Sequence, residues 1–215
     1  MKDLLLDILN AADVMPENDY PTYAEVKNSL DLALDCSLKC VCVFPRFVKW
    51  AKTYCGKRVR ICALINRFDI GFYPAVSLVK ECVRGGADEI EFAASLCELK
   101  SGNIENLINE TRAITRSARR RTVKFNLCIN KITNEELSTL LLILPKCSID
   151  FVVLGETGEP FDRGKIESVM QSLGKKNKIK LIGDYSLEDC FNYYESGVSR
   201  FSSKKMINEL ILAKM

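Results

Sequence analysis

Short runs of aliphatic and β-branched residues alternate with longer stretches of helical periodicity along almost the whole chain of 215 residues. Strands that alternate with helices form parallel βαβ units, because two parallel strands need a crossover connection. Seven runs have the length and composition of buried strands. They cover residues 40–44, 59–65, 89–93, 123–128, 149–154, 178–182 and 198–201. The sequence therefore predicts an α/β fold built on a parallel sheet.

Helices are expected between these runs. Apolar residues recur at intervals of three and four over residues 74–84, 104–119 and 134–144. A capping box of the form S/T-x-x-E runs from Thr133 to Glu136, and the acidic residues that follow Ser186 favour the positive end of a helix. These signals predict a helix start next to each capping residue.

The number of strands decides the architecture. Residues 4–9 read Leu-Leu-Leu-Asp-Ile-Leu and are the candidate for an eighth strand, although their periodicity also allows a helix. Eight strands close a barrel, whereas seven leave an open, flavodoxin-like sheet. No low-complexity linker or break in composition divides the chain. We therefore expect a single domain over residues 1–215, a (β/α)8 TIM barrel, and keep the open sheet as the alternative.

Composition argues against several functional classes. Histidine is absent, which disfavours a zinc enzyme or a Ser-His-Asp hydrolase. Lys and Arg outnumber Asp and Glu by only 31 to 28, and this excess of positive charge is too small to indicate a nucleic-acid-binding surface. The ten cysteines lie mostly in apolar runs, without a C-x-x-C motif or an evident signal peptide. We expect reduced thiols in a cytoplasmic protein with no metal, no cofactor and no membrane contact. Cys42 lies between two valines and is expected in the core, with a reactive thiol as the alternative.

Polar residues within the predicted strands can be assigned to a side, because barrel strands alternate between the pore and the helices. The apolar neighbours of Glu91 and of Lys180 suit the helix layer, which turns these two side chains inward, and Lys124 faces inward for the same reason. Charges in a barrel interior are costly unless they pair. We therefore expect an ion pair between Glu91 and Lys180. It would be either a proton shuttle beside an amine nucleophile or a purely structural pair.

Several blocks of the sequence resemble one enzyme family. Residues 41–48 read Val-Cys-Val-Phe-Pro-Arg-Phe-Val, residues 86–91 read Gly-Ala-Asp-Glu-Ile-Glu, and residues 99–103 read Leu-Lys-Ser-Gly-Asn. Together with residues 149–152, 180–189 and 200–203, they are similar to the motifs of the deoxyribose-phosphate aldolases, in the same order. Those enzymes are (β/α)8 barrels that split 2-deoxyribose 5-phosphate through a lysine Schiff base. The resemblance implies the same fold here.

The resemblance also reveals differences at the site that it implies. Val153 stands where the family has its Schiff-base lysine, and valine has no amine. Glu91 replaces the family's aspartate, and Cys128 replaces a carboxylate of the fourth strand. Asp184 stands at the second glycine of the phosphate-binding loop, where an anion would repel phosphate. Lys180 keeps the residue type of the family.

The resemblance further implies a phosphosugar ligand, a homodimer or another protein partner, and a phosphate site at Gly158, Gly183, Ser202 and Ser203. Because the expected lysine is missing, we expect aldolase activity to be lost or strongly reduced, with a phosphosugar-binding or partner-binding role retained. The alternative is an active aldolase that releases acetaldehyde and glyceraldehyde 3-phosphate, in which Lys180 forms the Schiff base and Glu91 moves protons through a water. A third hypothesis is a structural or regulatory subunit.

Overall fold

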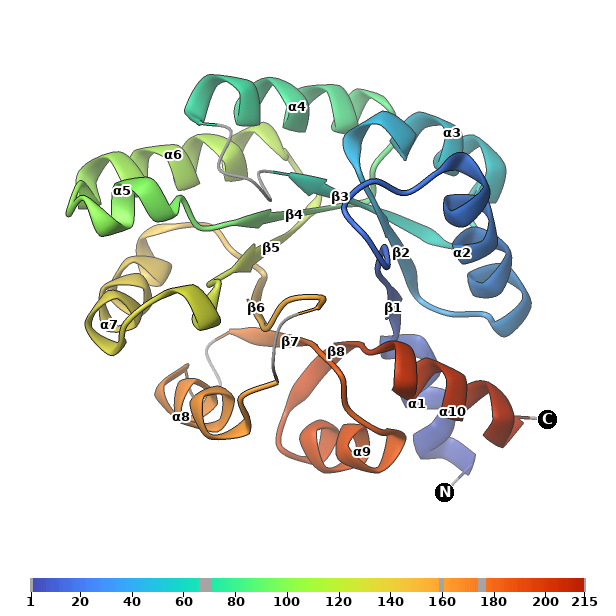
Figure 1. Cartoon of the computed structure of the whole chain (residues 1–215). Coiled ribbons are helices and arrows are strands. Elements are labelled where there is room, and N and C mark those ends of the chain that lie inside the picture. The colour runs from blue at the N-terminus through green and yellow to red at the C-terminus, as the bar shows by residue number, and fades with distance from the viewer. Residues whose placement is uncertain (1, 66–70, 159–160, 174–176, 215) are drawn as a thin grey trace.

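The computed structural model describes residues 2–65, 71–158, 161–173 and 177–214. Its eight strands form one parallel sheet in the order of the sequence. They are β1 Asp13–Val14, β2 Cys40–Val43, β3 Arg60–Ile65, β4 Glu89–Ala93, β5 Thr122–Asn126, β6 Phe151–Leu154, β7 Lys178–Ile182 and β8 Val198–Ser202. A parallel bridge between Ala12 and Phe201 brings β8 back to the segment before β1 (Figure 1). The predicted (β/α)8 TIM barrel is confirmed.

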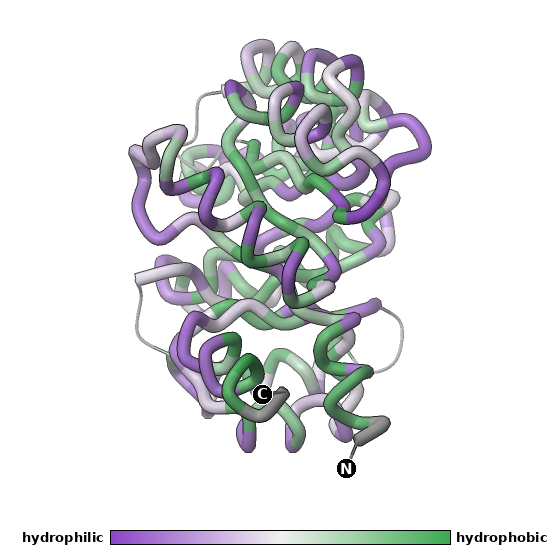
Figure 2. The backbone as a smooth tube through the Cα atoms, turned by 90° about the vertical axis from the view of Figure 1, so that its right-hand side faces the viewer, coloured by the Kyte–Doolittle hydropathy of each residue, from purple (hydrophilic) through white to green (hydrophobic). Residues whose placement is uncertain are grey.

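Helices surround this barrel (Figure 1). They are α1 Lys2–Ala11, α2 Tyr23–Cys36, α3 Val48–Cys55, α4 Phe72–Arg84, α5 Leu96–Lys100, α6 Ile104–Ser117, α7 Asn134–Ile143, α8 Arg163–Leu173, α9 Leu187–Glu195 and α10 Lys204–Lys214, with 3-10 turns η1 Pro45–Phe47, η2 Ile129–Lys131 and η3 Leu144–Lys146. Both chain ends lie on the same side, where α1 and α10 contact α9 (Figures 1 and 2). Among the described residues, no helix has the length and apolarity needed to span a membrane.

The start of the chain is a helix, which corrects the eighth strand expected at residues 4–9. α1 packs on β8 and α9. Ile8 and Leu9 are buried whereas Leu6 is 58% exposed, which follows a helical stripe rather than the alternation of a strand. The eighth strand is instead the two-residue β1, whose Asp13 pairs with Cys40 of β2.

Local capping signals act where they were expected. The Thr133 side chain accepts a hydrogen bond from the Glu136 N–H at the start of α7, and Ser186 caps α9 in the same way. Thr22 and Glu25 form a further capping box at the start of α2, which the sequence analysis did not identify. Side-chain oxygens therefore satisfy backbone N–H groups at the starts of these helices and help to fix where each begins.

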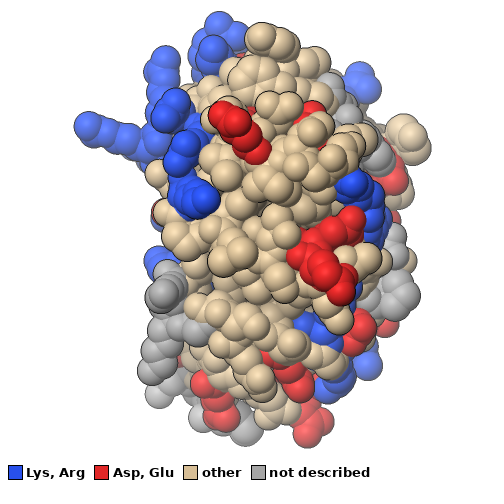
Figure 3. All heavy atoms as spheres, turned by 90° about the vertical axis from the view of Figure 1, so that its left-hand side faces the viewer, with Lys and Arg blue, Asp and Glu red and all other residues tan. Residues whose placement is uncertain are grey.

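The surface carries charges of both signs. Figure 3 shows many Lys and Arg side chains at the upper left edge of the face formed by α5, α6 and α7, and further ones interspersed with acidic side chains toward its right side. The small excess of cations in the sequence, 31 against 28 acidic residues, agrees with such a mixed surface.

The barrel divides the buried residues into two sets. Outward-facing strand residues such as Phe125, Val152 and Leu154 pack under the helices in one large apolar core. Figure 2 shows hydrophobic segments through the middle of the molecule and hydrophilic ones mostly at its outer turns. The inward-facing residues differ, because many of them are charged or carry sulfur. The candidate chemistry of this protein therefore lies inside the barrel and at its mouth.

Candidate functional site

Asp13 is the centre of a buried ionic network inside the barrel. Its side chain is completely buried and meets cations from three other strands. Lys124 Nζ lies 2.6 Å from Asp13 Oδ2, and Lys180 Nζ lies 3.1 Å from the same oxygen. Arg200 donates from Nε and Nη2 to Asp13 Oδ1. One carboxylate thereby links β1 to β5, β7 and β8 through charge-assisted hydrogen bonds.

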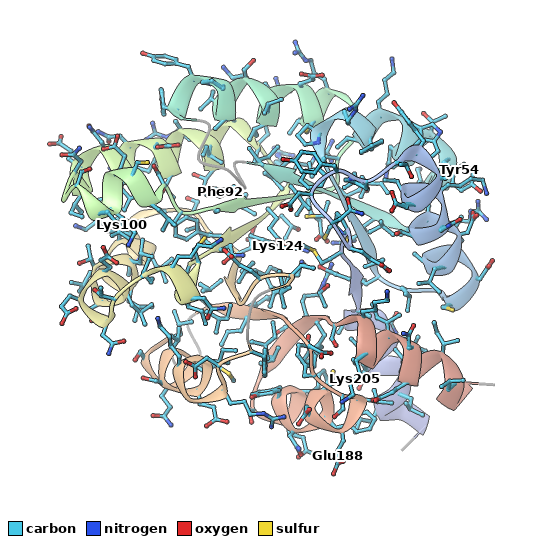
Figure 4. All side chains as sticks on the ribbon, in the orientation of Figure 1. Tyr54, Phe92, Lys100, Lys124, Glu188 and Lys205 are labelled. Atoms are coloured by element: carbon cyan, nitrogen blue, oxygen red, sulfur yellow. The ribbon has the colours of Figure 1, made fainter. Side chains whose placement is uncertain are left out.

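Two glutamates of β4 complete the network. Glu89 Oε2 lies 2.6 Å from Lys124 Nζ and 3.2 Å from Arg200 Nη2. Glu91 Oε2 lies 2.7 Å from Lys180 Nζ. Three buried carboxylates thus face three buried cations, which offsets the cost of removing these charges from water. Figure 4 shows Lys124 near the centre of the barrel, among side chains that project from the surrounding strands.

The pairing sets the protonation states of these groups. Burial raises the pKa of Asp13, but the three cations more than offset this and hold the pKa well below its ordinary value. Burial lowers the pKa of Lys180, but Cys42, Glu91 and Asp13 together raise it above its ordinary value. Burial raises the pKa of Glu91, and its pairing with Lys180 only partly offsets that effect. At neutral pH Lys180 is therefore an ammonium rather than a free amine.

The expected ion pair of Glu91 and Lys180 is confirmed, with both side chains pointing into the barrel at 5% and 0% exposure. Val153 of β6 is the register partner of Lys180 and is completely buried. Side chains paired in register on parallel strands point to the same side of the sheet. Val153 therefore presents an apolar group to the interior beside the ammonium. A catalytic role for Glu91 and Lys180 stays a prediction.

The carboxyl ends of β5 and β6 are braced by Asn126. Its Nδ2 donates to the Gly155 carbonyl at 3.1 Å, and its Oδ1 accepts from the Cys128 N–H at 2.8 Å. Cys128 lies beyond the strand on which it was expected, because β5 ends at Asn126. Gly155 has a φ of 89°, and a Cβ there would lie 2.0 Å from the Ile182 carbonyl oxygen. Only glycine allows β6 and β7 to approach so closely.

Sulfur atoms occupy another part of the interior, in a cluster of Cys40, Cys42, Cys62 and Met15. Cys42 forms one group with Cys40 and Asp13 and another with Cys62 and Glu91, and both groups are close enough to hold a metal ion. Lys180 Nζ already lies among these atoms, 3.6 Å from both Cys42 Sγ and Met15 Sδ. Because this ammonium fills the position of a cation, we do not assign the cluster to a metal.

A cavity of about 1350 Å³ opens at the carboxyl ends of the strands. The last residues of β1, β2 and β7 contribute to its wall. Active sites of TIM barrels lie at this end. Met15 and Cys42 reach the cavity, but Lys180, Glu91 and Val153 are not among the described residues that line it. Lys180 therefore lies one layer beneath the cavity, covered by two sulfur-containing side chains.

The four residues expected to bind phosphate all border this cavity, and they are Gly158, Gly183, Ser202 and Ser203. Both hydroxyl groups already donate internally. Ser202 Oγ donates to the Asp13 carbonyl at 2.9 Å, and Ser203 Oγ donates to the Tyr185 carbonyl at 2.7 Å. These bonds hold the loops after β7 and β8 in place. Phosphate binding by the four residues stays a prediction.

Other groups on the same wall have donors to spare. The N–H groups of Lys204 and Lys205 lie in the first turn of α10, where no intrahelical acceptor exists. Both residues border the cavity, and Figure 4 labels Lys205 on α10. Thr157 Oγ1 is buried and has no hydrogen-bond partner among the described residues. Asp184 adds an exposed acidic group to the wall. The mouth of the barrel thus combines unpaired donors with three carboxylates, because Glu17 and Glu25 border the cavity as well as Asp184.

Three members of the ionic network were not identified from the sequence. Glu89 and Arg200 obey the same alternation as Glu91 and Lys180, and this pattern places their side chains inside the barrel. The sequence indicates Asp13 as an interior residue less clearly, only as a single charge in the apolar run of residues 11–15. Its strand has only two residues, too few to show any periodicity.

Comparison with known proteins agrees with this fold. No family model matches the chain. A deoxyribose-phosphate aldolase from Streptococcus pyogenes serotype M4 is 27% identical over 209 residues, which cover 94% of this chain and 92% of the relative. The solved structure of the aldolase QR15 gives a TM-score of 0.87 at 21% identity and covers 97% of both chains. The tetrameric deoxyribose phosphate aldolase from Aeropyrum pernix gives 0.79 at 18% identity, over 99% of this chain and 97% of that one.

The structural matches establish the fold, and the sequence match extends over almost the full length of both proteins. The motif blocks at residues 41–48, 180–189 and 200–203 contribute residues to the cavity wall, whereas the block at residues 99–103 lies at the end of α5. The chain is therefore similar in sequence to deoxyribose-phosphate aldolases over almost its whole length, and it shares its fold with solved aldolases.

Proposed function

We propose that this protein binds a phosphorylated sugar in the cavity at the barrel mouth and does not cleave it through a lysine Schiff base. The observation that carries this proposal is the state of Lys180. Its side chain is completely buried, bound to Glu91 and Asp13, and has the apolar Val153 as its register partner. An amine in this state lacks both the free electron pair and the access that a nucleophile needs.

A Schiff base requires a neutral amine that touches the substrate carbonyl. A second lysine lowers the pKa of its neighbour by repulsion, but Val153 provides no charge and the repulsion from Lys124 is outweighed. The surrounding anions instead hold the pKa of Lys180 above its ordinary value, against the effect of burial. Met15 and Cys42 also separate Lys180 from the cavity. The chemistry and the position of Lys180 both oppose covalent catalysis.

Binding of a phosphosugar is supported by the donors at the cavity wall. The first turn of α10 directs backbone N–H groups toward the cavity mouth, and helix N-termini attract anions. The side chain of Lys205 adds positive charge, whereas Lys204 already pairs with Glu17 at 2.9 Å. Thr157 Oγ1 offers a buried hydroxyl for a sugar oxygen. A homologue named for deoxyribose phosphate makes a phosphorylated sugar the first ligand to test.

An active aldolase that uses Lys180 is the second candidate, and one observation favours it. Met15 and Cys42 line the cavity and contact Lys180 Nζ, so a change in the Met15 rotamer would bring the ammonium closer to a ligand. In that state Glu91 would accept the proton that Lys180 must lose. This candidate predicts turnover of 2-deoxyribose 5-phosphate, whereas the first predicts binding alone.

Calorimetric titration with 2-deoxyribose 5-phosphate, together with an assay for released acetaldehyde, separates the two candidates. We expect saturable binding without acetaldehyde. Lys205→Ala should weaken binding about fivefold, because it removes a charge beside the phosphate. Lys146→Ala is the matched control, because this exposed lysine precedes β6 at the opposite end of the barrel. Absence of binding would contradict the proposal, and acetaldehyde release would favour the active aldolase. The expected homodimer stays a prediction that analytical ultracentrifugation would test.

A further inference from the structure

Cys42 is the one cysteine of this chain that borders the cavity, within the part that the structure describes. Its side chain is only 2% exposed and lies at the inner end of the cavity beside Met15. Cys40 and Cys62 lie behind it and are completely buried. A small molecule that enters the cavity would therefore meet the sulfur of Cys42 first.

Lys180 lies against this sulfur, with its Nζ 3.6 Å from Cys42 Sγ. Hydrogen bonds from Cys40 and Cys62, and then the charge of Lys180, hold the pKa of the Cys42 thiol well below its ordinary value, although burial acts in the other direction. The carboxylates that face the same space from β1 and β4 are themselves paired with buried cations. The thiolate is the nucleophilic form of cysteine, so this environment activates Cys42.

Cys62 is placed to bond covalently with Cys42. The two residues are register partners on β2 and β3, and both belong to the interior cluster. Register partners on neighbouring strands have Cα atoms about 4.8 Å apart, within the range of about 4.4–6.8 Å that a disulfide spans. Cys40 is two residues from Cys42 on the same strand, at a Cα separation of about 6.6 Å, close to the upper limit. Cys62 is therefore the better partner.

We propose that Cys42 is a site of oxidation by small hydroperoxides, with Cys62 as the second thiol that closes a disulfide inside the barrel. The Cys42 thiolate attacks the terminal peroxide oxygen, which forms an S–O bond and breaks the O–O bond. The leaving oxygen takes a proton and departs as an alcohol, or as water from hydrogen peroxide. The Cys62 sulfur then attacks the sulfenic sulfur, an S–S bond forms, and the hydroxyl leaves as water with the Cys62 proton.

This oxidation would change the state of the neighbouring amine. A disulfide carries no negative charge, so Lys180 would lose one of the anions that keep it protonated. Glu91 and Asp13 would remain as its partners. The inference does not depend on phosphosugar binding, because it rests on the interior thiols and on access from the cavity.

The test is to treat the reduced protein with a small excess of hydrogen peroxide, block the remaining thiols with an alkylating agent, and map the peptides by mass spectrometry. We expect a disulfide between Cys42 and Cys62 that dithiothreitol reverses. Oxidation of Cys42 should be about tenfold faster than that of the exposed Cys97, because the thiolate reacts faster than the thiol. If Cys97 were oxidised faster than Cys42, or if Cys42 were not oxidised at all, the proposal would be overturned without the need for any variant.

Three variants sharpen the result. In Cys62→Ser, dimedone should trap a sulfenic acid on Cys42, because the second thiol is gone. In Cys42→Ser, Cys62 should stay reduced, because peroxide then has no activated thiol to attack. Cys40→Ser is the matched control, since it removes a buried thiol of the same cluster but should leave the disulfide in place. A disulfide between Cys40 and Cys42, or oxidation of Cys62 in Cys42→Ser, would contradict the assigned roles.

Discussion

The barrel interior and the cavity at its mouth are built from the same strands, but their polar groups are used differently. Inside, Asp13, Glu89 and Glu91 are matched by Lys124, Lys180 and Arg200, and all six side chains are almost completely buried. At the mouth, the first turn of α10 and the Thr157 hydroxyl have donors without internal acceptors. The charged groups of the interior are paired with one another, whereas the donors at the mouth are available to a ligand.

This difference separates stability from binding. A charge that is already paired gains little by meeting a ligand, and breaking its pair is costly. An unpaired donor at a cavity wall gains a hydrogen bond when a ligand arrives. Met15 and Cys42 lie between the two regions and keep the ligand away from the ion pairs. Inward-facing charges in a TIM barrel therefore need not be catalytic.

The largest effect is expected from Asp13→Ala. The substitution leaves Lys124, Lys180 and Arg200 with fewer anions than cations in a closed space. We expect the free energy of unfolding to fall by about 3–5 kcal/mol, the usual cost of removing one partner from a buried ion pair. Urea denaturation followed by circular dichroism would measure it.

The matched control for this substitution is Glu17→Ala. Glu17 pairs with Lys204 at the surface, and both side chains are about 70% exposed. Exposed pairs contribute little to stability, so the denaturation midpoint should hardly move. If the two substitutions had similar effects on stability, the interior network would not be the structural element described above.

Val153→Lys should have the next largest effect, because it adds an amine to the satisfied interior. Two neighbouring ammonium groups repel, which should lower the pKa of Lys180 and of the introduced amine. We expect a loss of more than about 2 kcal/mol in the free energy of unfolding, because a charge is buried without a partner. Val153→Met is the control, since it fills similar space without a charge. Equal stability of the two variants would indicate that residue 153 does not face Lys180.

Acid should reduce the contribution of the buried ionic network to stability, whereas the contribution of the apolar core does not depend on protonation. The pKa of Asp13 is lower in the folded protein than its unfolded-state value of 3.8. The stabilisation by the ionised Asp13 is therefore complete above pH 3.8 and is lost as the pH falls through the folded-state pKa. The unmodified protein should exceed Asp13→Asn in unfolding free energy by about 2 kcal/mol at pH 7. This difference should shrink only below about pH 4. Denaturation curves for both proteins across this range provide the measurement, and a pH-independent difference would argue against an ionised Asp13.

The smallest effect is expected on ligand binding in the cavity at the barrel mouth. Asp184 is exposed at the cavity wall and should repel a bound phosphate through water, a weak and salt-dependent force. Asp184→Gly should tighten binding of a phosphosugar about threefold at low ionic strength and less at high salt. Calorimetry at two salt concentrations would show this. Equal or weaker binding by the variant would place the phosphate elsewhere in the cavity.

The sequence predicted the repeating part of the molecule well. Seven strands lie where the aliphatic runs are, because each run has four or more residues and can show its pattern. The pair of Glu91 and Lys180 also followed from alternation. The start of the chain was proposed as a strand with a helix left open, because an apolar run with a single aspartate fits both periods. Packing against β8 and α9 decides for the helix.

The rest of the site could not be derived from local patterns. Asp13 is 187 residues from Arg200 in the chain, and only closure of the barrel brings the two side chains together. The cover that Met15 and Cys42 form over Lys180 also depends on side-chain positions from different strands. Sequence alternation tells which side of the sheet a residue faces, but not which residues lie at the same height in the barrel.

Borohydride trapping with acetaldehyde tests the central claim most directly. Sodium borohydride reduces a Schiff base to a stable secondary amine, and peptide mapping locates it on an individual lysine. At neutral pH we expect no ethyl group on Lys180, because its ammonium is buried and bound to Glu91 and Asp13. Stoichiometric ethylation of Lys180 in the unmodified protein would contradict the account and identify the chain as a working aldolase.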